Sequence, residues 1–355
     1  MLSIDFAPME GITGFAFRNA HHRYYGGISR YYTPFLNVQE GARFGRADER
    51  DISYENNKAL LEDQACTLVP QLLAGRSEAL TAGIRRLCEL DYQEINWNLG
   101  CPSPTVTRKG RGAGLLAEPE KIDRILSETY EALEKENLKF NLSVKMRTGM
   151  DSAEHFPELV SILNRYPLSE IILHPRFAAQ GYQGTADEEA FAAALSQSTH
   201  TLTWNGDITS VADAEKIHEK FPQVERIMIG RGLLVNPALA EKIRNREGRT
   251  ASREAGGLSV EGMQPADGGT SVQKFPSEAA RFRAFHDEIL RGYQSYIPDE
   301  KGVLARMKEL WGWWEKSPVY AGGGAVQENS TRLLKKIRKA KSLGEYRVLA
   351  EQALQ

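Results

Sequence analysis

Cysteine is scarce in this sequence, and its scarcity excludes two structures that cysteines commonly form. The three cysteines, Cys66, Cys88 and Cys101, are odd in number and lack the spacing of a zinc cluster or a disulfide framework. Unpaired thiols are typical of proteins in reducing compartments. We therefore expect no metal site and a cytoplasmic protein.

Long apolar runs and a secretory leader are also missing. No stretch approaches the roughly 18 apolar residues that cross a bilayer. The first residues, MLSIDFAPMEG, lack the basic segment and long apolar run of a signal peptide. These absences predict a protein that has no membrane partner.

An excess of charge of one sign is lacking as well. The chain has 45 basic and 47 acidic residues, which leaves a formal net charge of −2. This balance gives no global attraction to nucleic acid, so an RNA contact has to come from a local basic patch. Hydrophobic residues make up 41% and charged residues 26%, which is ordinary for a folded globular protein.

Eight short runs rich in β-branched or apolar residues recur along the chain. They lie at residues 3–7, 29–34, 66–73, 93–98, 140–146, 169–174, 201–205 and 225–229. Most are followed by turn residues and then by helical spacing, as at residues 77–90, 120–136, 153–165, 188–196, 211–221 and 237–246. Asp187 and Ser210 are suited to cap two of these helices.

Strands that alternate with helices in this way are typical of a parallel α/β fold. Eight strands are the number needed for a closed (β/α)8 barrel of the TIM type. An open, doubly wound sheet is the alternative, but the glycine-rich dinucleotide turn after its first strand is missing, and the first strand ends in APMEG. We therefore predict the TIM barrel.

The composition changes near residue 248. Residues 248–277 are rich in glycine and serine and have little periodicity, which indicates a linker or mobile loop. Helical spacing returns at residues 278–296, 302–316, 328–341 and 343–353. We therefore predict a catalytic barrel over residues 1–247, a linker over 248–277, and a small C-terminal all-helical domain over 278–355.

Polar side chains and glycines follow nearly every predicted strand, where a TIM barrel carries its chemistry. They are Met9, Gln71, Asn98 with Cys101, Lys145 with Arg147, His174 with Arg176, Asn205-Gly206-Asp207 and Gly230-Arg231-Gly232. Glycines in the last two loops allow backbone N–H groups to approach a phosphate, and Arg231 adds a charge-assisted contact. One such loop alone would be explained by a tight turn, whereas the pair predicts a phosphate-bearing cofactor.

Seven stretches of the chain resemble the tRNA-dihydrouridine synthase family of flavoenzymes. They are APMEGITGFAFR, VPQLL, NLGCPSPTVTRKGRGAGLL, VKMRTG, HPRFAAQGYQGTAD, NGDITS and MIGRGLLVNP, which occur in the family's order. The most specific is NLGCPSP followed by KGRGAGLL, and LARMKELWGWW resembles the family's helical C-terminal domain more weakly. The resemblance implies bound FMN, NADPH or NADH as reductant, and reduction of the C5–C6 double bond of specific uridines in tRNA.

The resemblance also implies roles for single residues. Cys101 is the expected catalytic acid, and a thiol with an ordinary pKa of about 8.5 holds a proton at neutral pH. The FMN contacts implied are Ala7, Pro8, Met9, Gln71, Lys145, His174, Asn205, Gly206, Asp207, Gly230 and Arg231. Asn98 is expected near the substrate base. Arg176 is a further substrate contact, with a structural pair to Asp187 as the alternative.

Two basic sets are candidates for RNA contact. Arg108, Lys109 and Arg111 follow Cys101, and Lys335, Lys336 and Arg338 lie in the C-terminal helical region. A basic helix alone is usually a solvated face, but beside the barrel motifs these sets favour contact with RNA phosphates. The target base would have to be flipped into the pocket. We expect a monomer whose helical domain binds tRNA.

Two alternatives stay open at this point. An FMN-dependent barrel oxidoreductase acting on a small molecule would share the phosphate loops, and a catalytically inactive RNA-binding relative would share most motifs. We further expect His21 and His22 on the surface of the first helix. The cluster Trp311, Trp313 and Trp314 is expected in the core of the helical domain.

Overall fold

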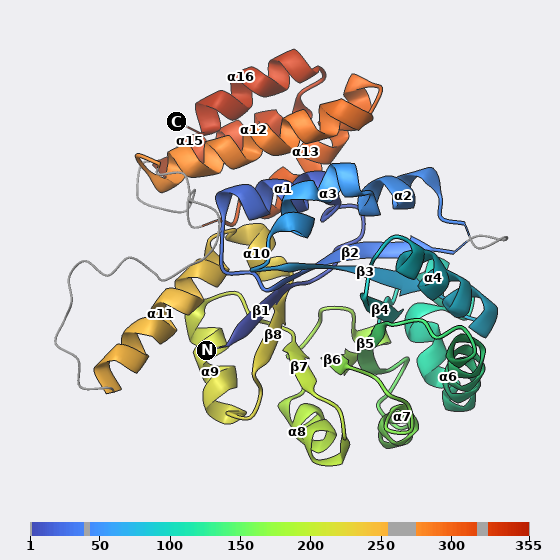
Figure 1. Cartoon of the computed structure of the whole chain (residues 1–355). Helices are drawn as coiled ribbons and strands as arrows, with labels where there is room; N and C mark the ends of the chain where they lie inside the picture. Colours follow the sequence, from blue (N-terminus) through green and yellow to red (C-terminus); the bar gives the residue numbers. More distant parts are fainter. Residues whose placement is uncertain (1, 39–42, 255–274, 318–325, 355) are drawn as a thin grey trace.

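Eight parallel strands form a closed barrel in the computed structural model, which describes residues 2–38, 43–254, 275–317 and 326–354. The strands are β1 (Ser3–Phe6), β2 (Arg30–Asn37), β3 (Thr67–Leu73), β4 (Glu94–Leu99), β5 (Asn141–Gly149), β6 (Glu170–Phe177), β7 (Leu202–Asn205) and β8 (Arg226–Ile229). β1 pairs with β8 and closes the ring, as Figure 1 shows. The predicted (β/α)8 barrel is confirmed, and the open sheet is excluded.

Helices surround this barrel. They are α1 (Phe15–Tyr24), α2 (Arg46–Ile52), α3 (Tyr54–Glu62), α4 (Ser77–Glu89), α6 (Pro119–Glu134), α7 (Phe156–Leu163), α8 (Glu188–Gln197), α9 (Val211–Lys220) and α11 (Leu239–Glu254). The short helices α5 (Pro104–Thr107) and α10 (Arg231–Val235) lie in the loops after β4 and β8. Asp187 and Ser210 cap α8 and α9 as predicted, because their side chains accept backbone N–H groups of the first turn.

The barrel interior explains why the mouth is polar. Tyr32, Val69, Ile172 and Met228, with Ala7, form an apolar layer across the middle of the barrel. Side chains alternate along a strand, so the residue two positions beyond an inward-facing one also faces inward. Gln71, His174 and Gly230 each lie two positions beyond a residue of that layer. They therefore face inward at the open end of the barrel.

A helical unit follows the barrel and packs on α1. It contains α12 (Glu278–Tyr296), α13 (Glu300–Trp314), α15 (Val326–Lys339) and α16 (Leu343–Ala353), drawn orange to red in Figure 1. Phe285 of α12 lies edge-on to Phe17 and Tyr25, with ring centroids 5.4 and 5.3 Å apart. Trp311 and Trp314 are fully buried in this unit, as expected, whereas Trp313 is only partly buried against the same core.

The expectation that His21 and His22 lie on the surface is wrong. His21 is completely buried between the barrel and α12, with its ring nitrogens 2.8 Å from the Tyr31 hydroxyl and 3.0 Å from the Pro237 carbonyl. The His22 side chain is only 11% exposed. His21 is buried because it packs against both the barrel and Phe285 of α12, whereas His22 packs against Asp63 and Cys66 before β3.

The boundary between barrel and helical unit differs in one detail from the prediction. α11 continues to Glu254, past the expected end of the barrel at residue 247. Residues 255–274 of the predicted linker lie outside the described residues, so the division into domains stays a prediction. Among the described residues, no helix has the length and apolar content needed to cross a membrane.

Candidate active site

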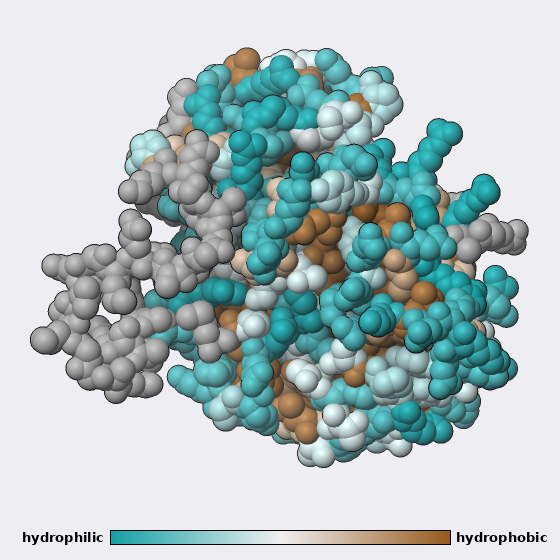
Figure 2. Space-filling view, viewed as in Figure 1, coloured by the Kyte–Doolittle hydropathy of each residue, from teal (hydrophilic) through white to brown (hydrophobic). Residues whose placement is uncertain are grey.

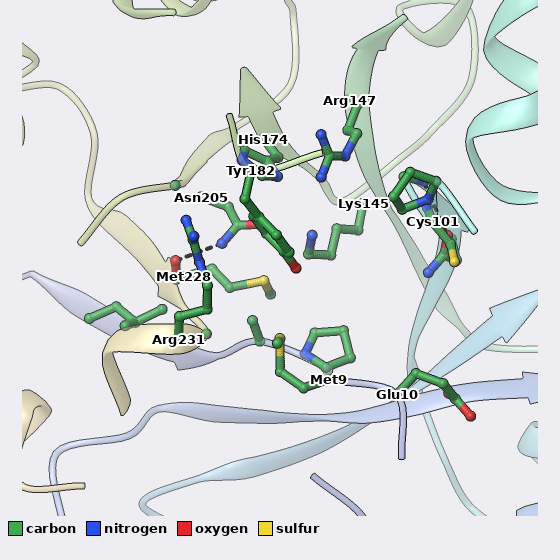
Figure 3. Close-up of a pocket in the computed structure, with 18 of the residues that line it drawn as sticks. Met9, Glu10, Cys101, Lys145, Arg147, His174, Tyr182, Asn205, Met228 and Arg231 are labelled. Carbon is green, nitrogen blue, oxygen red and sulfur yellow. Dashed lines mark hydrogen bonds between the residues drawn. The ribbon is translucent and has the colours of Figure 1, made fainter. Parts of the chain in front are cut away.

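A cavity of about 310 Å³ opens at the C-terminal ends of the strands, within the usual size range of ligand pockets. All residues predicted to bind the cofactor line it: Ala7, Pro8, Met9, Gln71, Lys145, His174, Asn205, Gly206, Asp207, Gly230 and Arg231. Asn98 and Cys101 line the same cavity. Figure 3 shows Arg231 and Cys101 on opposite sides of it, with Lys145 between them. The fold therefore gathers residues that lie far apart in the sequence.

Buried amides form one wall of the cavity. Gln71 Nε2 donates to Asn96 Oδ1 at 2.7 Å, and Asn98 Nδ2 donates to Gln71 Oε1 at 2.7 Å. Asn98 Oδ1 then accepts the backbone N–H groups of Gly100 and Cys101 at 3.1 and 2.9 Å. These bonds fix the orientation of each amide. Asn98 thereby also fixes the first turn of the loop that carries Cys101.

The Cys101 loop is held from the other side by the glycine-rich segment after α5. The backbone N–H of Ala113 donates to the Cys101 carbonyl at 3.1 Å. Gly112 has a φ of +55°, and a Cβ atom there would lie 3.0 Å from the same carbonyl oxygen. Only glycine suits this position, because a side chain would be both strained and crowded. The motif KGRGAG thus shapes the cysteine loop.

The thiol of Cys101 keeps its proton at neutral pH. Burial is the main cause that raises its pKa above the ordinary value, and the nearby Glu10 carboxylate acts in the same direction. The backbone of Ser103 and the positive charge of Lys145 oppose the shift without reversing it. Cys101 is therefore suited to donate a proton, and a nucleophilic thiolate is disfavoured.

Lys145 is a cation without a partner. No hydrogen bond or ion pair of its ammonium group is found in the described part of the chain. Burial, reinforced by the positive charge of Arg147, lowers the pKa of Lys145 to about 7. An uncompensated charge in such a place is costly, and an anionic ligand would relieve the cost. The site is therefore built for a ligand that carries negative charge.

His174 is neutral and its tautomer is set by a neighbour. Burial, followed by the positive charges of Lys145 and three arginines, lowers its pKa to about 2. Its Nε2 lies 3.1 Å from Arg176 Nη1, and because a guanidinium only donates, Nε2 accepts. The ring proton is consequently on Nδ1.

Arg176 does not reach the cavity. It is 1% exposed, donates to both carboxylate oxygens of Asp207 at 3.0 and 2.6 Å, and donates to the Gln183 and Gly184 carbonyls at 3.2 and 2.6 Å. The alternative pair with Asp187 is not formed either, because Asp187 caps α8. Arg176 therefore positions Asp207, and its predicted contact with the substrate is not seen in this geometry.

Asp207 in turn positions Arg231. Its Oδ1 accepts from Arg231 Nη2 at 3.0 Å, and its Oδ2 accepts the backbone N–H of Ala186 at 2.9 Å. The Arg231 guanidinium stacks on the Tyr182 ring, 4.1 Å from the centroid. The Asp207 carboxylate thus faces arginines, so an anion at this corner would meet Arg231 and main-chain N–H groups.

The loops after β7 and β8 approach each other closely at the same corner. A Cβ atom on Gly232 would lie 2.3 Å from the Ile208 carbonyl oxygen, and one on Gly230 would lie 3.3 Å from Met9 Sδ. Asn205 Nδ2 donates to the Met228 carbonyl at 2.8 Å and joins the two strands. Arg231 and the adjoining glycines therefore form a compact set of donors, as in the phosphate sites of many TIM barrels.

Glu10, Arg147 and Tyr182 also line the cavity, and the sequence had assigned no role to them. Arg147 donates to the Gly181 carbonyl at 2.9 Å and so holds the loop that carries Tyr182 over the cavity. Burial raises the pKa of Glu10 to about 7. Glycines on both sides of the Tyr182 segment, Gly181 and Gly184 with φ of +58° and +66°, were the available signal for a tight functional loop.

The predicted RNA contacts lie outside the cavity. Arg108 and Lys109 are exposed, whereas Arg111 is half-buried and donates to Asn37 Oδ1 at 3.2 Å. Lys335, Lys336 and Arg338 are exposed on α15, where Arg338 pairs with Glu315. Figure 2 shows that hydrophilic residues cover most of the visible face of the helical unit.

One group of side chains could offer metal ligands in the described ranges. His22, Asp63 and Cys66 bring ligand atoms within 4.8 Å of one another before the start of β3, at the end of the barrel opposite the cavity. Burial raises the pKa of Cys66 to about 12, with Asp63 contributing. A protonated thiol is a poor metal ligand, and the expectation of no metal stays a prediction.

Comparisons with known proteins agree with this geometry. A family model described as "Dihydrouridine synthase (Dus)" matches residues 5–263. The tRNA-dihydrouridine(16) synthase of Pseudomonas syringae pv. tomato is 31% identical over 242 residues, which cover 68% of this chain and 74% of that protein. The protein of the same name from Pseudomonas putida is 30% identical over 243 residues, covering 68% and 73%.

Solved structures show the fold alone. Histamine dehydrogenase from Rhizobium sp. 4-9 has a TM-score of 0.51 at 11% identity, covering 70% of this chain and 46% of that one. The likeness supports the barrel architecture and says nothing of the reaction.

Proposed function

This chain belongs to the dihydrouridine synthase family, and on that ground we propose that it reduces the C5–C6 double bond of a uridine in tRNA. The observation that carries the proposal is the composition of one cavity. It combines a protonated thiol, Cys101, an unpartnered cation, Lys145, and an anion-binding corner around Arg231. Reduction of a uracil ring needs a proton donor and an anchored source of hydride, and this set suits both.

We propose that FMN is the ligand of the cavity. Arg231 and the glycine loops after β7 and β8 would hold its phosphate, and Lys145 would contact the electron-rich side of its ring. The amides of Gln71 and Asn98 would contact the ring edge, and the apolar surface of Ala7, Pro8 and Met9 would pack on the ring. FMN reduced by NADPH or NADH would supply the hydride for C6.

The chain supplies the proton. Cys101 holds a proton at neutral pH, so its S–H bond can break as the C5–H bond forms, on the face of the base away from the hydride donor. The positive charges of Lys145 and Arg147 and the Ser103 backbone stabilise the thiolate that remains. A proton from solvent then restores the thiol for the next reaction.

We propose that tRNA contacts the surface around the cavity. Arg108 and Lys109 lie exposed on the segment after Cys101, and Lys335, Lys336 and Arg338 lie exposed on α15. Their charges suit phosphates on either side of a base that has left its stack. The relatives reported above are named for position 16 of tRNA, and we propose the same target uridine here.

Mapping dihydrouridine in tRNA tests this function. We expect tRNA from cells that lack the protein to lose dihydrouridine at position 16, and the purified protein with NADPH to restore it. Turnover of free uracil without activity on tRNA would favour the small-molecule oxidoreductase. A colourless protein that binds tRNA without flavin would favour the inactive relative. Loss at a different position would correct the target and leave the reaction in place.

A further inference from the structure

A second cavity, of about 130 Å³, lies directly beside the candidate active site. Glu10, Pro34 and Phe35 line both cavities, so one wall separates them. The rest of its lining comes from the loop after β1, from α1, β2 and α2, and from α12 and α13 of the helical unit. The helical unit, docked on the barrel, therefore supplies part of the wall of this cavity.

A planar stack forms part of its wall. The guanidinium carbon of Arg50 lies 4.1 Å from the centroid of the Tyr296 ring. Phe15 packs on the same ring, with centroids 5.0 Å apart, and fixes its orientation. Stacked planes of this kind, from aromatic rings or from arginine, are the surfaces on which proteins receive unstacked RNA bases.

The Arg50 guanidinium packs on the Tyr296 ring, a contact that uses none of its hydrogen-bond donors. No hydrogen bond or ion pair of its side chain is found in the described ranges, although Asp48 and Asp51 line the same cavity. Arg306 in the same wall differs, because it donates to the Gly11 carbonyl at 2.6 Å and pairs with Glu309 at 3.3 Å. Arg306 therefore ties the helical unit to the barrel, whereas the donors of Arg50 are available to a ligand.

Hydrogen-bond acceptors stand in the same wall. The Glu10 carboxyl has no hydrogen bond or ion pair in the described part of the chain, and Asp48 uses one oxygen to accept the backbone N–H of Asn37 at 3.0 Å. Carboxylates repel the phosphates of RNA, but they accept the N–H groups at the edge of a base. A stacking plane beside such acceptors is suited to a nucleobase.

We propose that this second cavity binds the nucleobase adjacent to the reacting uridine in the RNA strand. The base stacks on Arg50, and its N–H groups donate to Glu10. The proposal rests on the proposed function, because the neighbouring base reaches this cavity only when the uridine enters the active site. Two cavities that share a wall suit two consecutive nucleotides, and the second makes activity depend on the base beside the target.

The test is the kinetics of dihydrouridine formation on unmodified tRNA by Arg50→Ala and Arg50→Lys. Both variants lose the planar stack, while Arg50→Lys keeps the charge. We expect each to raise KM about tenfold, with kcat changed less than about threefold, as for the loss of one stacked base. Arg46→Ala is the matched control, because it removes the same charge from an exposed position of α2 outside the cavity.

A second arm separates contact from a structural effect. Each neighbour of the reacting uridine is replaced in turn by an abasic residue. One of the two RNAs is expected to raise the KM of the unsubstituted protein about tenfold, and Arg50→Ala is expected to add nothing further on that RNA, since partners in contact are not additive. Melting temperature and flavin content report whether each variant is folded.

The outcomes separate the two hypotheses. No dihydrouridine from the unsubstituted protein would refute the proposed function. Normal activity of that protein with an unchanged KM in both Arg50 variants would refute the second cavity alone. Independent, multiplied effects of Arg50→Ala and the abasic residue would also overturn it.

Discussion

Replacing Lys145 with methionine is expected to stabilise the flavin-free protein while it weakens flavin binding. Burial lowers the pKa of Lys145 from 10.5 to about 7, whereas the unfolded chain keeps the ordinary value. Between these two values the unfolded chain binds more protons than the folded protein, so the free energy of unfolding rises with pH across this window. The cost of the buried charge is fully present below about pH 7 and disappears above about pH 10.5.

The size of the effect follows from the shift. One pKa unit corresponds to about 1.36 kcal/mol, so the upper limit is about 5 kcal/mol. Water around a side chain that is not fully buried reduces this, and we expect Lys145→Met to raise the free energy of unfolding by about 1–3 kcal/mol at about pH 7. The gain should shrink by about pH 9.5, because the lysine of the unsubstituted protein is then neutral when folded.

Urea unfolding of flavin-stripped proteins at these two pH values measures the effect. Lys301→Met, at an exposed position of α13, is the matched control and should change little at either pH. Flavin titration of the same variants should show at least about tenfold weaker binding for Lys145→Met alone. A variant that is no more stable at about pH 7, or a gain that does not depend on pH, would refute the assignment of Lys145 as an unpartnered buried cation.

Three further predictions concern the residues around the cavity and on α15. Arg231→Ala is expected to weaken flavin binding about tenfold through loss of a charge-assisted hydrogen bond, measured by fluorescence titration; unchanged affinity would remove it from the phosphate site. Arg176→Met is expected to lower the free energy of unfolding by about 2–3 kcal/mol, because it breaks a pair in which Arg176 is 1% exposed and Asp207 is 36% exposed. Equal stability in urea would contradict that role. The triple change Lys335→Ala, Lys336→Ala and Arg338→Ala is expected to raise KM for tRNA and to flatten its salt dependence by about one unit of slope for each phosphate that the variant no longer neutralises. An unchanged slope would exclude α15 from the RNA interface.

The strands were predictable because their pattern is local. Each of the eight runs carries its own apolar residues and is followed by turn residues, so the barrel follows from their number. Helices α2 and α3 were not predicted, since both are short and polar, and α2 buries only Ile52. The burial of His21 was also out of reach, because it depends on Pro237 and on Phe285 of α12, which lie more than two hundred residues further along the chain.

The sequence predicted which residues meet in the site better than it predicted the contacts that each of them makes. The strand-end rule and the motifs placed Cys101, Lys145 and Arg231 at one opening, where the structure has them. The partner of Arg176 depends on the loop after β7, where Asp207 has a φ of +50° that brings its carboxylate to the arginine. Glu10 is brought to the cavity by loop geometry that no spacing in the sequence reveals, and the flanking glycines Gly181 and Gly184 were the signal available for Tyr182.

A single turnover without oxygen tests most directly whether the cavity brings a hydride donor and the Cys101 thiol to one uridine. The protein is reduced with NADPH, freed of excess nucleotide and mixed with unmodified tRNA, while the visible absorbance of oxidised flavin and the dihydrouridine content are followed together. The unsubstituted protein should form one dihydrouridine for each flavin reoxidised, and Cys101→Ala should bind flavin but react at least about 100-fold more slowly. Equal rates for the two proteins, or reoxidation without dihydrouridine, would contradict the mechanism.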